Sequence, residues 1–376
     1  MTSTFLITSS EEFQSAARAE LKRFEPQLTE GDNLAPGLFL VHSALTEDDF
    51  AALVEASHPI YTRHIFPVQT QIKLEANIQD LENISLVIAE KVQAAGWSPN
   101  IQYSVQARLA GEGSHPYSPF AIREAIVSKL AELGQGQENI KDSEQIVSVV
   151  CNEGQAYLGL SRPAQNLSGW AGGMRHYAKG PEQISRAEFK LLEALEVFDV
   201  DLPRRGTALD LGAAPGGWSR ILLDVGLSVI AVDPAALDER LPATDLQSQS
   251  RKRTTSISAQ PFHHAGIATL GHYRGYAEDY LQQAREEHRR FELICNDMRM
   301  DALVAARLMV DFAPLLAPSG FALSSLKLPH ETRKLKPTAL VNRALAILGE
   351  AYGEVQARQL FHNRQEITVL LRQPLA

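Results

Sequence analysis

The chain has 376 residues, of which 44% are hydrophobic and 22% charged, and its formal net charge is −9 at pH 7. This length exceeds one ordinary hydrophobic core and predicts two or three domains, while the hydrophobic content argues against a disordered chain. The negative charge argues against a protein that coats nucleic acid non-specifically, although it is compatible with a local basic face.

Strand and helix signals alternate over the first part of the chain. The opening residues lack the basic stretch and apolar core of a signal peptide, and they predict a strand over 5–8. A helix over 11–24, a Pro/Gly-containing loop, a strand LFLVHS, a helix over 46–56 and an extended stretch follow. This order predicts a small α+β domain over 1–72.

A second set of elements follows that domain. We expect a helix over 81–95, a strand IQYSVQARL, a helix over 120–133 and a hairpin that turns at 152–154. The segment 166–181 is rich in glycine and aromatic residues and reads as a linker. No run of 18 apolar residues occurs, and the two cysteines lie outside any CxxC pattern, so we expect a cytoplasmic protein without a membrane span, disulfide or metal site.

From residue 184 onward, apolar strand signals alternate with helices and end in a hairpin. The strand candidates are TALDLG, SVIAVD, FELICND and FALSSLKL. This pattern is typical of an α/β domain with a mostly parallel sheet, here with an antiparallel last strand. The polar stretch over about 235–272 is expected to be a flexible insertion.

A glycine-rich loop is the strongest local signal. The strand ALDL leads into a loop with Gly212, Gly216 and Gly217, and a helix follows. The loop has neither the Walker A pattern nor GxGxxG spacing, but α/β sheets bind nucleotide-like ligands at this position. Asp233 ends the next strand and is placed to accept hydrogen bonds from ribose hydroxyls. The alternative is a glycine turn and a strand-end acid without a ligand.

Four further charged residues stand at comparable positions. Lys190 lies on the helix before the glycine loop, and the other three stand at strand ends: Asp297, Lys327 and Glu366. Because the carboxyl ends of parallel strands meet at one edge of a sheet, we expect these charges to cluster near the ligand. Taken singly, each could be an ordinary surface or strand-end residue.

Several motifs resemble the FtsJ-type RNA ribose 2′-O-methyltransferases. The motifs that show this resemblance are DLGAAPGGW, CND, SLKLP and HNRQEITV. Longer stretches, SRAEFKLLEAL and ARQLFHNRQEITVLLR among them, resemble the RlmM-like branch, whose members methylate a cytidine of 23S ribosomal RNA. The N-terminal half resembles, more weakly, the ferredoxin-like plus THUMP arrangement that holds RNA in this family. The implied domains are ferredoxin-like over 1–72, THUMP-like over 73–175 and a methyltransferase domain over 180–376.

The resemblance implies S-adenosyl-L-methionine as cofactor and a Lys-Asp-Lys-Glu tetrad made of Lys190, Asp297, Lys327 and Glu366. Lys327 is expected to be the general base, which requires a partly neutral amine, and the other three to tune and position it. Lys190 and Lys327 could exchange these roles. The resemblance places the methyl donor against Ser185, Gly212, Ala214, Pro215, Gly216, Gly217, Trp218, Asp233, Asp279 and Asp297.

Two of the residues expected to contact the methyl donor have a second interpretation. Trp218 is expected to pack against the sheet although it belongs to the loop. Asp279 would lie by the adenine, or it could be an acid that stabilises a helix start.

Three basic clusters, the first in the insertion and the other two flanking the predicted pocket, indicate where RNA could bind, although solvated surface is the alternative. They are Arg251–Arg253, then Arg333, Lys334 and Lys336, then Arg358, Arg364 and Arg372. Four aromatic residues could stack on bases, but such residues more often form cores: Tyr103, Tyr117, Trp170 and Tyr177.

Two other functions stay open at this point. One is a base methyltransferase. The sequence NDMRM argues against methylation of a base amino group, and methylation at carbon 5 would need Cys295 as the nucleophile. The other is a non-enzymatic RNA-binding or ribosome-assembly protein with a methyltransferase fold, against which the complete loop and tetrad argue.

Overall fold

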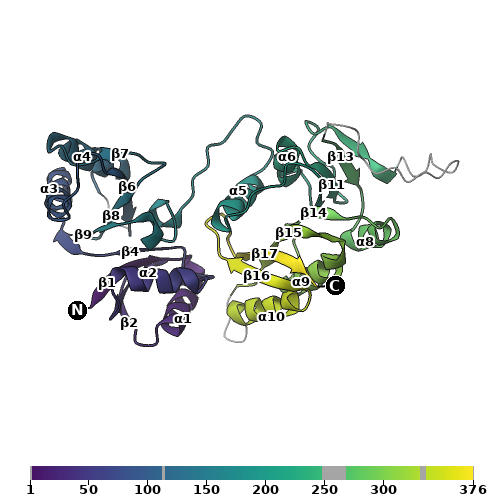
Figure 1. Cartoon of the computed structure of the whole chain (residues 1–376), viewed down its shortest axis with the longest axis horizontal. Coiled ribbons are helices and arrows are strands. Elements are labelled where there is room, and N and C mark those ends of the chain that lie inside the picture. The colour runs from purple at the N-terminus through teal and green to yellow at the C-terminus, as the bar shows by residue number, and fades with distance from the viewer. Residues whose placement is uncertain (1, 112–114, 248–267, 331–335, 376) are drawn as a thin grey trace. The chain divides into compact units, whose positions relative to one another are not determined.

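The computed structural model describes residues 2–111, 115–247, 268–330 and 336–375. The chain divides into two compact units, Met1–Arg175 and His176–Ala376 (Figure 1). None of the helices in the described ranges is long and apolar enough to cross a membrane.

The first unit begins with a four-stranded sheet in the order β2-β3-β1-β4. Its strands and helices are β1 (Ser3–Thr8), the 3-10 turn η1 (Glu11–Phe13), α1 (Gln14–Phe24), β2 (Thr29–Ala35), β3 (Leu38–Ser43), α2 (Glu47–Ala56) and β4 (His64–Pro67). This βαββαβ order is that of a ferredoxin-like fold. The Pro/Gly-containing loop expected before LFLVHS is wrong, because β2 pairs with β3 there.

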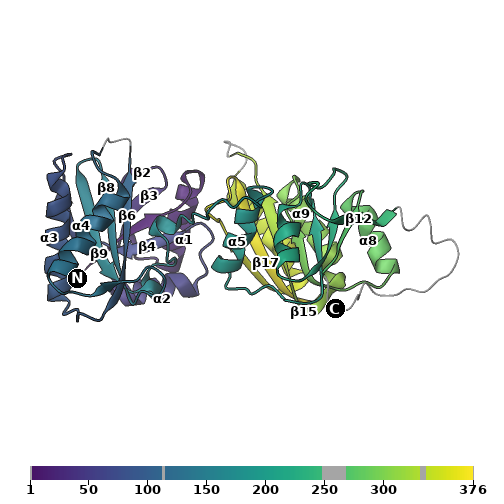
Figure 2. The same ribbon diagram turned by 90° about the horizontal axis from the view of Figure 1, so that it is seen from above.

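A second sheet completes the first unit, in the order β5-β9-β8-β6-β7. The strands of this sheet and the helices between them are β5 (Thr70–Lys73), α3 (Gln79–Ala94), β6 (Gln102–Ala110), α4 (Pro119–Glu132), β7 (Gln137–Glu138), β8 (Gln145–Asn152) and β9 (Gln155–Ser161). α3 and α4 lie side by side and bury their apolar residues against β6, β8 and β9 (Figure 2). Two 3-10 turns follow, η2 (Pro163–Gln165) and η3 (Ala171–Gly173).

The second unit is an eight-stranded sheet in the order β12-β13-β11-β10-β14-β15-β17-β16. Its elements are α5 (Ala187–Val197), β10 (Thr207–Leu211), α6 (Gly217–Asp224), β11 (Ser228–Val232), β12 (Ala243–Asp245), β13 (Leu270–Tyr273), α8 (Ala277–Glu286), β14 (Phe291–Asn296), α9 (Ala302–Phe312), η4 (Ala313–Leu315), β15 (Leu316–Lys327), α10 (Pro337–Gly349), β16 (Tyr352–Arg358) and β17 (Glu366–Pro374).

This sheet confirms the predicted α/β fold class. Neighbouring strands are parallel from β12 to β15, and β17 is antiparallel to both β15 and β16. α5 and α6 lie on one side of the sheet, and α8, α9 and α10 lie on the other (Figure 1). Both faces are therefore covered, which explains why the central strands read as continuous apolar runs.

The expected insertion over 235–272 is too wide. Residues 243–245 form the edge strand β12, and the next strand, β13, begins at Leu270. Both strands pair within the sheet, so part of the predicted insertion belongs to the domain itself. The basic run Arg251–Arg253 lies outside the described residues.

Candidate active site

The glycine loop joins β10 to α6, and close approach explains two of its glycines. A Cβ atom on Gly212, whose φ is +74°, would lie 2.4 Å from Met298 Cγ. A Cβ atom on Gly217 would lie 2.4 Å from Ser185 Oγ. Contacts this short are not tolerated, so a side chain at either position would displace a neighbour. The loop therefore brings its backbone closer to its surroundings than a larger residue allows.

Asp233 follows β11 and is bound to this loop. Its Oδ2 accepts a hydrogen bond from Ala214 N at 3.1 Å, and its Oδ1 accepts one from Ala235 N at 2.8 Å. A carboxylate oxygen accepts more than one hydrogen bond, so these two contacts leave capacity for ribose hydroxyls. The sequence expectation for Asp233 stays a prediction, and its carboxylate lies beside the loop as that prediction requires.

Ser185 supplies an independent sign of a ligand at the loop. Its Oγ is buried, and no described residue forms a hydrogen bond with it. The turn that carries Ser185 is fixed, because Glu188 Oε1 accepts hydrogen bonds from Ile184 N at 2.7 Å and Ser185 N at 3.2 Å. A buried hydroxyl without a partner is uncommon in folded proteins, and a polar ligand in the loop would satisfy it.

Trp218 and Asp279 have different surroundings from the other residues expected to contact the methyl donor. Trp218 is buried, and its Nε1 donates to Ala187 O at 2.7 Å, so the ring ties α6 to α5 as expected for a packing residue. Asp279 is exposed in the first turn of α8, just after β13. That position suits either of its two interpretations.

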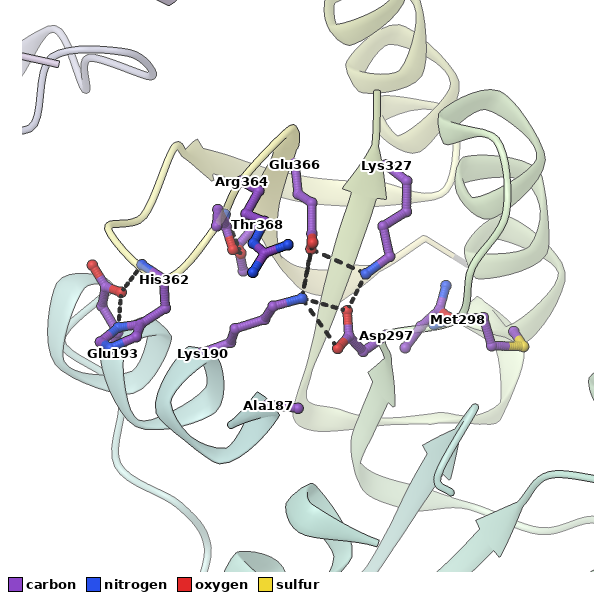
Figure 3. A network of polar contacts seen from close by, with 12 residues as sticks. Ala187, Lys190, Glu193, Asp297, Met298, Lys327, His362, Arg364, Glu366 and Thr368 are labelled. Carbon is purple, nitrogen blue, oxygen red and sulfur yellow. Dashed lines mark hydrogen bonds and ion pairs between the residues drawn. The ribbon is translucent and has the colours of Figure 1, made fainter. Parts of the chain in front are cut away.

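The four tetrad residues meet in one ion-pair network (Figure 3). Lys190 Nζ lies 2.8 Å from Glu366 Oε2 and 3.3 Å from each oxygen of Asp297. Lys327 Nζ lies 2.5 Å from Asp297 Oδ1 and 3.0 Å from Glu366 Oε2. The four side chains are between 13% and 22% exposed, so a substrate can reach them while most of their surface is shielded from water.

The sheet topology explains this convergence. Asp297 follows β14 and Lys327 ends the adjacent parallel strand β15, so both emerge at the same edge. Glu366 begins β17 and stands directly opposite Lys327 in the antiparallel register. Lys190 reaches the group from α5 (Figure 3).

The electrostatics of Lys327 differ from the sequence expectation. Burial lowers the pKa of its amine, but the carboxylates of Asp297 and Glu366 outweigh burial and raise the pKa above its usual value. The partly neutral amine that a general base requires is therefore not found in this state. Lys327 is an ammonium group at neutral pH.

Comparison with known proteins shows which family this part of the chain resembles. Residues 183–354 match the model of the FtsJ-like methyltransferase family. This segment is similar to FtsJ-like methyltransferases, and the match spans less than half of the chain. Its bounds include the glycine loop and three of the four tetrad residues, while Glu366 lies beyond the matched segment.

Two curated relatives of this chain carry the same name. The ribosomal RNA large subunit methyltransferases M of Shewanella sp. (strain W3-18-1) and Shewanella putrefaciens are each 29% identical over 230 residues, which is 58% of this chain. The chain covers 55% of each relative's length.

Solved structures also align with the chain, at low identity. TrmN from Thermus thermophilus covers 98% of this chain, and 99% of TrmN is covered, with 16% identity and a TM-score of 0.35. Fibrillarin from Aeropyrum pernix, solved with S-adenosyl-L-methionine, covers 59% of this chain, and 81% of fibrillarin is covered, with 17% identity and a TM-score of 0.34.

Asp210 is a residue of the second unit that the sequence analysis missed. It lies within β10, fully buried, and accepts a hydrogen bond from Ser219 Oγ at 2.6 Å. Burial raises the pKa of its carboxyl to about 7, with the nearby charges of Asp297 and Asp233 adding to the effect. An acid inside an otherwise apolar strand, next to the glycine loop, was the available signal.

Glu193 is a second missed residue, and it supports the tetrad. Its carboxylate is buried on α5 and accepts hydrogen bonds from Phe361 N at 2.7 Å and His362 N at 2.9 Å. His362 Nδ1 lies 2.7 Å from the same carboxylate (Figure 3). Since this loop leads directly into β17, Glu193 helps to fix Glu366 relative to Lys190.

The predicted basic clusters differ in their surroundings. Arg364 is exposed two residues before Glu366, and Lys336 is exposed just before α10. Arg372 lies 3.5 Å from Glu354, and Arg358 NH1 donates to Ala357 O at 3.3 Å. Arg333 and Lys334 lie outside the described residues. Tyr103 and Tyr117 are buried core residues, which is the more ordinary of their two interpretations.

Proposed function

We propose that this protein is an S-adenosyl-L-methionine-dependent ribose 2′-O-methyltransferase that acts on structured RNA, with 23S ribosomal RNA as its substrate. The meeting of Lys190, Asp297, Lys327 and Glu366 within hydrogen-bonding distance carries the proposal. Methyl transfer to a hydroxyl requires an oriented nucleophile and removal of its proton, and two amines held by two carboxylates can supply both.

The donor site of this proposal is the glycine loop with its surroundings. S-adenosyl-L-methionine supplies a methyl group already activated on a sulfonium. The residues proposed to hold it are Ser185, the loop residues Gly212 and Ala214–Gly217, Asp233, Asp279 and Asp297. The unpartnered Ser185 hydroxyl and the close backbone approach at Gly217 fit such a ligand. Trp218 supports this site by holding α6 on α5 rather than by touching the donor.

Lys327 is the proposed general base, and the contacts of the two lysines favour this choice. Lys190 Nζ has all four carboxylate oxygens of Asp297 and Glu366 within 3.3 Å. Lys327 Nζ contacts one oxygen of each carboxylate. The less enclosed amine is better able to turn toward a hydroxyl, so Lys190, Asp297 and Glu366 position Lys327.

Proton removal requires that Lys327 be neutral when the ribose hydroxyl is in place. The two carboxylates hold it as ammonium in the structure. A positive charge beside Asp297 would offset that carboxylate and lower the pKa of Lys327. A donor held by Asp297 brings such a charge, so we propose that the base is activated only when the donor site is filled.

The first unit is proposed to hold the RNA. Its two sheets would correspond to the ferredoxin-like and THUMP-like domains expected over 1–72 and 73–175. The relatives' name supports ribosomal RNA as the substrate class, since these proteins are named as methyltransferases of the large ribosomal subunit. A ribosomal RNA substrate would also place the protein in the cytoplasm.

The structure weighs against carbon-5 base methylation. Cys295 is completely buried in β14, and burial raises the pKa of its thiol well above the ordinary value. The thiolate required as a nucleophile is therefore disfavoured. A cofactor titration tests the non-enzymatic alternative, because a protein that has lost the enzymatic function should not bind the donor.

Mapping ribose methylation across ribosomal RNA, in cells with and without this gene, tests the proposal. We expect one 2′-O-methyl mark to disappear when the gene is deleted and to return with the wild-type gene. Purified protein should then methylate an RNA transcript that contains this nucleotide. The same RNA with a 2′-deoxy sugar at that position is the matched control and should accept no methyl group. Transfer to the deoxy substrate would overturn the ribose assignment.

A further inference from the structure

Strand β6 of the first unit has an open edge. One side of the strand pairs with β8 from Tyr103 onward, but on the other side β7 pairs only with Gln102 and Tyr103. On that second side Tyr103 O accepts a hydrogen bond from Asn139 N at 2.7 Å. Backbone groups of every second residue point to the same side of a strand, so those of Val105 and Ala107 also face it. No described strand pairs with them there, and such an edge is open to a ligand.

A pocket of about 260 Å³ lies along this edge. Its walls beyond β6 come from the start of α4, from Ile140 and from the segment 169–171. Phe120 on α4 is 65% exposed and Ile140 is 69% exposed, so two large apolar side chains face solvent around one hollow. Such a grouping is typical of a binding surface. The volume is below the range of about 300 to 1,000 Å³ for drug-sized ligands, which favours a single ring system.

Two aromatic rings line the pocket from opposite faces of the sheet. Phe120 belongs to α4, which covers the face on which the neighbours of Gln106 pack. Because side chains alternate along a strand, Gln106 points to the other face, where its Nε2 donates to Gly169 O at 2.9 Å. Trp170 follows Gly169 and lines the same pocket. A planar ligand that enters at the strand edge would therefore lie between the two rings.

The polar groups of the pocket suit an uncharged ligand. Gln106 is 6% exposed, and its Oε1 has no hydrogen-bond partner among the described residues. Arg123 is the charged side chain in the lining, and it is neutralised by Glu124, at 2.5 Å, and by Glu138. Its guanidinium lies 5.7 Å from the centre of the Phe120 ring, which helps to hold that ring in place. The pocket thus offers an unused acceptor without an excess of positive charge.

A nucleobase matches this description, because it is flat and uncharged, stacks through both faces and carries hydrogen-bonding groups on its edge. We propose that the pocket binds one unpaired base of the RNA, stacked between Phe120 and Trp170, with its edge toward Gln106 and the backbone of β6. This inference rests on the proposed function, because it takes RNA as the ligand. Stacking needs no basic surface, which suits a chain of net charge −9.

A peptide strand is the other ligand that an open sheet edge can bind. The pocket follows only four residues of β6, Ser104–Ala107, and has an aromatic ring on each face of the sheet. A strand would need a longer edge and room for side chains that alternate between the two faces. The observations therefore favour the base.

The test compares Phe120→Ala with Ile78→Ala in the full-length protein. Ile78 is 66% exposed beside α3 and lies outside the pocket, so its replacement removes a similarly exposed apolar side chain. For a single-stranded oligonucleotide of large-subunit ribosomal RNA, Phe120→Ala should raise the dissociation constant at least about fivefold, the loss expected for one stacked base. Ile78→Ala should leave it unchanged, and Phe120→Trp should keep wild-type affinity. Equal affinities of the two alanine variants would overturn the proposal and favour a peptide strand at this edge.

Two further measurements separate a base from a phosphate. The weaker binding of Phe120→Ala should have the salt slope of the wild type, because no charge is removed. It should also disappear when the oligonucleotide is annealed to its complement, since a paired base cannot enter the pocket. A reduced salt slope, or equal weakening for the single strand and the duplex, would overturn the proposed base site.

The outcome is separable from that of the proposed function. RNA binding that depends on Phe120, in a protein that transfers no methyl group, would refute the enzymatic proposal and leave the base pocket standing. Methyl transfer with equal RNA affinity in Phe120→Ala and Ile78→Ala would do the reverse.

Discussion

Lys190 Nζ contacts both carboxylate oxygens of Glu366, at 3.0 Å from Oε1 and 2.8 Å from Oε2. One residue belongs to α5 and the other begins β17, so the contact joins a helix to the antiparallel strand of the sheet. Lys327 reaches only one of these oxygens. The two amines of the tetrad are therefore not equivalent, and this difference makes their roles testable.

Replacing Lys327 should separate donor binding from methyl transfer. In Lys327→Ala, Lys190 still neutralises the two carboxylates, so the dissociation constant of S-adenosyl-L-methionine should change little. Methyl transfer should fall by about 10²- to 10⁴-fold, the usual contribution of a general base. Calorimetric titration and transfer of a labelled methyl group measure the two quantities. Lys179→Ala, at an exposed position of the same unit, is the control. Unchanged turnover in Lys327→Ala would remove the residue from the mechanism.

Glu366→Gln should shift the pH dependence of methyl transfer to lower pH. The carboxylates of Asp297 and Glu366 raise the pKa of Lys327, so neutralising one of them lowers it. The rate should rise with pH as Lys327 loses its proton, and the midpoint of this rise should occur at a lower pH in the variant. Single-turnover rates across the alkaline range measure the shift. A midpoint that stays fixed would mean that another group titrates.

Asp233→Ala should weaken donor binding. The carboxylate fixes the loop through Ala214 N and is proposed to accept hydrogen bonds from the ribose of the donor. Hydrogen bonds to a charged group contribute about 1.5 to 3 kcal/mol, so the dissociation constant should rise by at least about tenfold. Asp224→Ala, on the exposed surface of α6, should leave it unchanged. Equal affinities of the two variants would place the donor elsewhere.

Gly217→Ala tests the close approach at the loop. The added Cβ would lie 2.4 Å from Ser185 Oγ and 3.1 Å from Glu188 Cγ, so the turn that carries Ser185 must move. We expect a loss of stability of about 1 to 3 kcal/mol and a weaker donor affinity. Gly349→Ala adds a methyl group where no atom lies within 4 Å and should have neither effect. Denaturant unfolding and donor titration provide the comparison.

Asp210→Asn should remove a pH dependence of stability. The folded-state pKa of Asp210 is raised from 3.8 to about 7, so the protonated acid is favoured in the folded protein. The stability that this shift contributes is present below pH 4 and is lost as the pH rises to 7, with a magnitude on the order of 4 kcal/mol. The asparagine variant should therefore lose less stability than the wild type between pH 5 and 8. If the wild type and Asp210→Asn lost the same stability between pH 5 and 8, the raised pKa of the buried carboxyl would be contradicted.

The apolar strands and the glycine loop were predictable because parallel strands buried on both faces have a continuous hydrophobic signal. Because the carboxyl ends of parallel strands meet at one edge of a sheet, the common location of Asp297 and Lys327 was also predictable. The edge strand β2 was missed because its residues are exposed or half-buried and carry no such signal. The protonated state of Lys327 could not be foreseen either, since it depends on which carboxylate oxygens reach the amine and on the register that sets Glu366 opposite it.

The distance along the chain between Lys190 and Glu366, 176 positions, has a consequence for folding. The four charges can neutralise one another only after the central strands and the closing hairpin have assembled, because each comes from a different element. A compact intermediate with a misplaced hairpin would bury Lys190 or Asp297 without its full set of partners, which is costly. The tetrad thus penalises nearly correct arrangements of the sheet.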